Sequence, residues 1–172
     1  MKVDIFDTQN KYDVIYADPP WRYDFSKTKN REIENQYPTM TVEEICNLPI
    51  PAKENSVLYL WATAPKLLEA LKVMQSWGFE YKTHSIWDKR TIGMGYWFRG
   101  QHELLLVGVK GKFSPPAAEH RVSSVFSEKK TKHSKKPLWY LEYLSKTYQD
   151  LSKIELFARQ YADGWDCWGN EV

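Results

Sequence analysis

Chemistry-bearing residues are concentrated at 13–21 (DVIYADPPW), an apolar run that stops on a carboxylate, two prolines and an indole. The segment 14–17 predicts a buried parallel strand, because it is short, nearly continuous in apolar residues and bounded by residues that break strands. The prolines must end this strand, since neither has an N–H group to donate. Asp18 and Trp21 are therefore expected at the carboxyl end of a strand, where open α/β sheets bind ligands.

These groups suit a flat amino group on an aromatic ring. The Asp18 carboxylate and the Pro19 carbonyl can accept both of its N–H bonds, and Trp21 offers a face for stacking. The amino group of adenine is a poor nucleophile because its lone pair is delocalised into the ring. Accepting both N–H bonds raises electron density on nitrogen and stabilises the charge that develops as it attacks. The alternative is a strand that ends in a Pro-Pro turn with a surface carboxylate.

The rest of the chain supplies elements that would position this motif. Further strands are predicted at residues 2–6, 56–62, 79–87, 102–110, 122–126 and 153–158. Helices are predicted at residues 41–48, 65–77 and 137–148, the first opened by a capping box from Thr41 to Glu44. This alternation predicts a doubly wound α/β sheet with right-handed crossovers.

Two helices carry apolar residues at helical spacing, which predicts the faces that they bury. The stripe of the second helix comprises Leu67, Leu68, Leu71, Met74 and Trp77. The stripe of the third comprises Leu138, Leu141, Tyr143 and Leu144. Both stripes are expected in the core.

Three long connections have two interpretations each. Residues 22–38 contain basic and aromatic side chains. They form either a flap over a nucleobase or a solvated loop. Residues 88–101 hold Tyr96, Trp97 and Phe98 and form either a hairpin or crossover loop with its own small core, or a second wall of a substrate cleft. Residues 111–137 end in a run of lysines that is either a solvated face or a phosphate contact.

Length and composition predict one globular domain over residues 1–172. Hydrophobic residues make up 42% of the chain and charged residues 27%, with a net charge of only +2. Cys46 and Cys167 lack metal-ligand spacing and are expected as free thiols in a reducing compartment. With no signal-peptide pattern and no run long enough to span a bilayer, we expect a cytoplasmic protein.

Eight segments together closely resemble one family, the Asp-Pro-Pro-Trp branch of S-adenosylmethionine-dependent adenine N6-methyltransferases, which includes the eukaryotic messenger-RNA N6-methyladenosine writer. They cover nearly the whole chain in order. The segments are ADPPW (17–21), YPTM (37–40), LYLW (58–61), WGF (77–79), HELLLVG (102–108), HSKKP (133–137), IELFAR (154–159) and WGNE (168–171). With its compact length, the chain looks like the phage and bacterial DNA-modifying members, which implies the cytoplasm of a prokaryotic or phage-infected cell.

The resemblance implies a Rossmann-like class I methyltransferase fold with a mostly parallel sheet. Its motif order is permuted, with the catalytic strand first and the cofactor strand last. It also implies that Asp18 and Pro19 hold the adenine amino group, that Pro20 shapes the turn, and that Trp21 and Tyr37 contact the base.

For the cofactor S-adenosylmethionine, the resemblance implies binding by Asp18, Lys136, Arg159, Asn170 and Glu171. Lys136 matches the lysine that meets the methionine carboxylate. No glycine-rich fingerprint follows the strand at 154–159, so cofactor binding rests on Lys136 and the C-terminal tail. The cysteine and histidine zinc fingers of the eukaryotic writer are missing, and no metal is expected.

The resulting hypothesis is methyl transfer to N6 of adenine in DNA by a monomer or homodimer. The alternatives are the same reaction on RNA, a catalytically silent nucleic-acid-binding partner subunit, and a nucleotide-binding α/β protein without methyl transfer. Sequence specificity is expected from the loops 22–36, 88–101 and 112–132, with a short or relaxed context. The candidate nucleic-acid contacts are Lys27, Lys29, Arg31, Arg99, Lys129, Lys130 and Lys132.

Overall fold

The computed structural model describes residues 1–23, 38–131 and 135–172, which fold around a seven-stranded sheet in the order β5-β3-β4-β2-β1-β6-β7. The strands are β1 (Tyr12–Ala17), β2 (Ala52–Ala62), β3 (Glu80–Asp88), β4 (His102–Lys110), β5 (Val125–Ser127), β6 (Lys153–Leu156) and β7 (Asp166–Trp168). The helices are α1 (Val42–Cys46), α2 (Leu67–Ser76) and α3 (Leu138–Thr147), with short 3-10 turns at Ala64–Lys66 and Ala118–His120. The predicted α/β class is confirmed.

Strand β1 lies near the middle of the sheet, as its apolar sequence predicts. It pairs in parallel with β2 on one side and with β6 on the other. Val14, Ile15 and Ala17 are fully buried, because both faces of the strand are covered. The ladder with β6 aligns Ala17 with Leu156, so the two strands end together.

The sheet is mostly parallel but contains an antiparallel part. The pairs β1–β2, β1–β6, β3–β5 and β6–β7 are parallel, whereas β4 runs antiparallel to both β2 and β3. Strands β3 and β4 form a hairpin, which needs no crossover helix. The loop at 88–101 is therefore a hairpin connection.

Two strand predictions at the ends of the chain are wrong. Residues 2–6 form no strand: Lys2 makes a single bridge to Cys167, and the chain turns at residues 5–7. Strand β6 is not the last, because β7 in the tail pairs with it in parallel. Three residues are too few for a periodic pattern, so only the pairing with β6 reveals β7.

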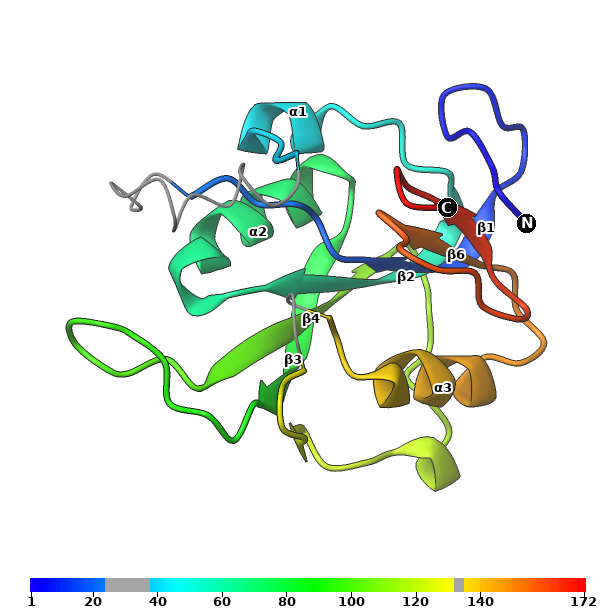
Figure 1. The fold of residues 1–172 in the computed structure, drawn as a ribbon. Coiled ribbons are helices and arrows are strands. Elements are labelled where there is room, and N and C mark those ends of the chain that lie inside the picture. The colour runs from blue at the N-terminus through cyan, green and yellow to red at the C-terminus, as the bar shows by residue number, and fades with distance from the viewer. Residues whose placement is uncertain (24–37, 132–134) are drawn as a thin grey trace.

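Helices cover both faces of the sheet, with α1 and α2 on one side and α3 on the other (Figure 1). On the first side, Ile45, Val73 and Met74 pack against the apolar residues of β1, β2 and β4. On the second side, Tyr140 and Leu144 pack in the other core cluster. Among the described residues, none of these helices is long and apolar enough to cross a membrane.

In each of the two predicted helix stripes, one leucine that was expected in the core is exposed. Leu68 is 79% exposed, because α2 buries the face formed by Ala70, Val73 and Met74, which lies almost opposite Leu68. Leu138 is 49% exposed, since it begins α3 at the margin of the buried face. The other predicted stripe residues are buried or partly buried.

Helix α1 depends on capping and on one buried hydrogen bond. The predicted capping box is present, with the Thr41 side chain accepting from the Glu44 backbone N–H. A helix of five residues is not stable by itself. The indole N–H of Trp77 donates to the carbonyl of Ile45 at 2.9 Å in the core and so ties α1 to the end of α2.

Replacing Trp77 by Phe should lower the free energy of unfolding by about 1–3 kcal/mol, because the Ile45 carbonyl loses the indole donor and the core loses part of the Trp77 ring. Urea denaturation measures the difference. The matched control is Trp97→Phe, since the Trp97 side chain is 96% exposed and should contribute almost nothing. Equal stability of the two variants would contradict this role of the indole.

Candidate active site

Asp18 directly follows β1 and pairs with a lysine brought from the other end of the chain. The Lys136 ammonium lies 3.0 Å from Oδ2 of Asp18 and 3.6 Å from Oε1 of Glu103 in β4. It also lies 5.5 Å from the centre of the Trp61 ring. Burial lowers the pKa of Lys136, but the carboxylates of Asp18 and Glu103 more than offset this, so its pKa is raised and it stays an ammonium.

The turn after Asp18 is held by backbone and indole hydrogen bonds. The Trp21 backbone N–H donates to the Pro19 carbonyl at 2.9 Å, and the Met40 N–H donates to the Pro20 carbonyl at 3.0 Å. The indole N–H of Trp21 donates to the Trp61 carbonyl at 3.1 Å, and Trp21 is only 5% exposed. Trp21 thus packs in the core and fixes the turn, while its stacking on a base stays a prediction.

A pocket of about 350 Å³ opens where β1 and β6 end. Its size is within the usual range for a small-molecule site. Residues from the first strand, the segment before α3, and the tail line it together: Tyr16, Asp18, Lys136, Glu155, Arg159 and Glu171. The parallel ladder between β1 and β6 explains this meeting, because both strands deliver their carboxyl ends to one edge of the sheet.

Glu155 is a pocket residue that the sequence prediction missed. Its Oε2 atom is buried and has no hydrogen-bond partner among the described residues. Burial, followed by the charge of Asp18, raises its pKa to about 7. Glu103, which pairs with Lys136, was missed too. A carboxylate inside an otherwise apolar strand is the sequence pattern that marks both residues, because such a group is costly to bury without a role or a partner.

The tail closes one side of the pocket. Nε of Arg159 lies 3.6 Å from Oε1 of Glu171, which joins the end of β6 to the C-terminal segment. The Ala158 N–H donates to the Trp168 carbonyl at 2.9 Å, and Gly169 lies so close that an added Cβ would be 2.3 Å from the Ala158 carbonyl oxygen. Asn170 is exposed and does not line the pocket, so its cofactor role stays a prediction.

The predicted nucleic-acid contacts are only partly within the described residues. Arg99, Lys129 and Lys130 are exposed, the first on the β3–β4 loop and the others after β5. The remaining predicted contacts, Lys27, Lys29, Arg31 and Lys132, lie outside the described residues, as does Tyr37. In the described ranges, no three His, Cys, Asp or Glu side chains are grouped as metal ligands.

The mostly parallel seven-stranded sheet and the pocket at the ends of β1 and β6 are those of a Rossmann-like methyltransferase fold. A family model described as MT-A70 matches residues 12–171. The chain belongs to this family of N6-adenine methyltransferases.

Individual relatives agree with the family. The chain is 35% identical to the type II methyltransferase M.MunI of Mycoplasma sp, over 95% of this chain and 79% of that protein. It is 32% identical to the human N(6)-adenine-specific methyltransferase METTL4 and 29% identical to the catalytic subunit METTL3 of the human N(6)-adenosine-methyltransferase. Each match covers 94% of this chain, which spans 37% of METTL4 and 28% of METTL3.

The raised pKa of Glu155 predicts a pH-dependent stability difference. From about pH 4.5 to about pH 7 the folded protein keeps a proton that the unfolded chain loses, so this residue lowers stability as the pH rises through that window. Glutamine does not titrate, so the free energy of unfolding of Glu155→Gln relative to that of wild type should be higher at pH 8 than at pH 5, by on the order of 2–3 kcal/mol. Urea denaturation at both pH values measures this gain.

The exposed residue Glu142 on α3 supplies the control, because Glu142→Gln should show almost no pH-dependent difference. A Glu155→Gln variant with the same stability difference at pH 5 and pH 8 would refute the raised pKa.

Proposed function

We propose that this protein transfers a methyl group from S-adenosylmethionine to the N6 amino group of adenine in DNA. The observation that carries the proposal is the position of Asp18, which ends β1, pairs with Lys136 and lines the pocket. One carboxylate thereby borders both the turn that would hold the amino group and the cavity that would hold the methyl donor.

The pocket residues fit S-adenosylmethionine. Lys136 offers an ammonium for the methionine carboxylate, as a compact point charge. Oε2 of Glu155, which has no hydrogen-bond partner within the described ranges, offers an acceptor for N–H or O–H donors inside the pocket. Glu171 and Arg159 line the pocket from the tail side and suit the ribose and adenine. The cofactor supplies an electrophilic methyl group on a sulfonium.

The turn supplies acceptors for the amino group. Pro19 has a carbonyl that takes the Trp21 N–H and, like any carbonyl oxygen, has a second lone pair for another donor. Asp18 accepts the other N–H bond and is placed to hold the proton that nitrogen loses when its bond to the methyl carbon forms. Because Trp21 and Pro20 are fixed by hydrogen bonds, these acceptors need little reorganisation during the reaction.

DNA is the proposed substrate because of one relative, and the surface charge fits nucleic acid in general. One relative, of which this chain spans 79%, is the type II methyltransferase M.MunI of Mycoplasma sp. Exposed cations at Arg99, Lys129 and Lys130 suit a phosphate backbone, although they do not distinguish DNA from RNA. Relatives named as adenosine methyltransferases make RNA the alternative that must be tested beside DNA.

The central experiment measures methyl transfer to adenine by wild type and Asp18→Asn, with DNA and RNA oligonucleotides competing in one reaction. Loss of an acceptor aimed at the reacting atom should slow transfer by about 10²–10³-fold. Mass spectrometry of the digested nucleosides identifies N6-methyladenine and the strand that carries it.

The exposed Asp150 provides the control variant, Asp150→Asn, which should keep wild-type activity. Methylation confined to RNA would exclude DNA as the substrate. A wild-type chain that binds nucleic acid without methylating it would instead indicate a silent partner subunit.

Lys136→Ala should weaken the binding of S-adenosylmethionine about tenfold or more, because the cofactor carboxylate loses its cation. Isothermal titration calorimetry gives the dissociation constant, and a melting curve checks that Asp18 and Glu103 tolerate the loss of their partner. Lys146→Ala, an exposed lysine on α3, is the matched control. An unchanged dissociation constant for Lys136→Ala would exclude the proposed contact.

A further inference from the structure

The β3–β4 hairpin ends in a cluster of aromatic side chains that pack against nothing in the described structure. Tyr96, Trp97 and Phe98 have relative exposures of 107%, 96% and 92%, and Ile92 and Met94 are exposed beside them. The small core that the sequence allowed for this loop does not form. Five adjacent large apolar side chains in water indicate a contact surface, because isolated exposed residues are common but such clusters are not.

The backbone holds this aromatic tip in a defined shape. The Gly93 N–H donates to the Gly100 carbonyl at 2.7 Å, and the Gly100 N–H donates to the Met94 carbonyl at 3.2 Å. An added Cβ on Gly95 would lie 2.1 Å from the Phe98 carbonyl oxygen, so only glycine permits this close turn. The tip is therefore a tight turn, held by backbone hydrogen bonds, with its aromatic side chains pointing outward.

The base of the hairpin is fixed next to the candidate active site. Asp88 accepts hydrogen bonds from the Arg90 N–H, the Gln101 amide and the Ser127 hydroxyl at 2.9–3.0 Å. Strand β4 starts at this edge, and its Glu103 lies 3.6 Å from Lys136, the partner of Asp18. In Figure 1 the green hairpin extends from the edge of the sheet at which β1 ends. The loop of 13 residues, 89–101, runs out and returns, so its tip can lie at most about 20 Å from the ends of β3 and β4.

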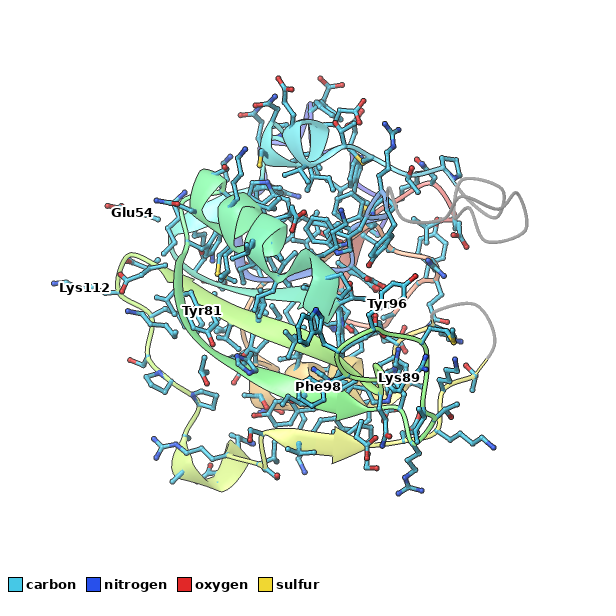
Figure 2. All side chains as sticks on the ribbon, turned by 90° about the vertical axis from the view of Figure 1, so that its left-hand side faces the viewer. Glu54, Tyr81, Lys89, Tyr96, Phe98 and Lys112 are labelled. Carbon is cyan, nitrogen blue, oxygen red and sulfur yellow. The ribbon has the colours of Figure 1, made fainter. Side chains whose placement is uncertain are left out.

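Positive charges lie beside the aromatic tip and at the base of the hairpin. Residues 89–101 include Lys89, Arg90 and Arg99 and contain no acidic residue. The Lys130 N–H donates to the Lys89 carbonyl at 3.3 Å, which places the exposed 129–130 lysines beside the hairpin base. Figure 2 shows Lys89 and Tyr96 near the same end of the sheet, away from Tyr81.

An apolar tip with one cation beside it and further cations at its base matches a duplex, which has phosphates outside and stacked bases inside. A second copy of this chain would bring another set of cations to the contact, which disfavours self-association through the tip. The reach of the hairpin exceeds the depth of the major groove, about 8.5 Å, so its aromatic side chains can meet the bases.

We propose that Tyr96, Trp97 and Phe98 form a wedge that enters duplex DNA next to the target adenine and stabilises the duplex while that base is outside the stack. Enzymes that modify a base must extrude it, and inserted apolar side chains partly replace the lost stacking. The inference rests on the proposed function and adds to it a duplex substrate and the element that opens it.

The test compares wild type with a triple variant, Tyr96→Ser, Trp97→Ser and Phe98→Ser, on the same target sequence as duplex and as single strand. The ratio of duplex to single-strand methylation should fall about tenfold or more, because a single strand needs no opening. Since these side chains are exposed, the melting temperature should not change. The control is Tyr81→Ser, an exposed aromatic at the other end of β3, which should keep the wild-type ratio.

A second readout does not depend on methyl transfer. With 2-aminopurine in place of the target adenine in a duplex, binding of wild type should raise its fluorescence, and the triple variant should lose most of that rise. If wild type methylates neither strand form, the proposed function fails, and the fluorescence alone decides whether the tip opens DNA.

Three outcomes would overturn the wedge. The first is a wild-type ratio and fluorescence rise in the triple variant. The second is an equal fall on duplex and single strand, which would indicate a general contribution to binding. The third is a change from dimer to monomer by sedimentation with an unchanged ratio, which would make the tip a contact between copies of the chain.

Discussion

The two parallel ladders of β1 are the constraint on which the site depends. Because β1 lies between β2 and β6, its carboxyl end meets the end of β6 at one edge of the sheet. Asp18 then lies in the same pocket as Glu155 and Arg159, which are more than 130 residues away in the chain. Helices on both faces bury these strands, so the edge is a rigid platform rather than a set of mobile loops.

The carboxylates of the pocket differ in whether a positive charge lies next to them. Lys136 compensates the charges of Asp18 and Glu103, and its ammonium lies 5.5 Å from the centre of the Trp61 ring. Glu155 receives no such compensation among the described residues, and its pKa rises to about 7. A pocket with the shared cation Lys136 and with an acceptor, Oε2 of Glu155, that has no partner among the described residues suits a ligand with both a carboxylate and hydrogen-bond donors.

Two different structures lie at the same edge of the sheet: a buried turn after β1 and an exposed hairpin between β3 and β4. The turn that contains Pro19 and Trp21 is fixed by hydrogen bonds, which is what the proposed acceptors of the amino group require. The β3–β4 hairpin instead exposes aromatic side chains on a tight glycine turn whose base is anchored at Asp88. The candidate active site therefore lies at the same edge of the sheet as a hairpin whose tip exposes three aromatic side chains.

The sequence by itself determined the features that depend on neighbouring residues. Continuous apolar runs and breakers located β1 and β4, and the capping box located α1, because backbone geometry and local hydrogen bonds specify these elements. The family motifs marked Asp18 and Lys136, and the structure joins the two in an ion pair.

Only the tertiary structure decided what depends on distant neighbours. The exposure of Leu68, the short strand β7, the raised pKa of Glu155 and the unpacked hairpin tip each follow from which elements pack against them. Burial and pairing are properties of the assembled sheet, whereas a periodic pattern reports only which side chains share a face.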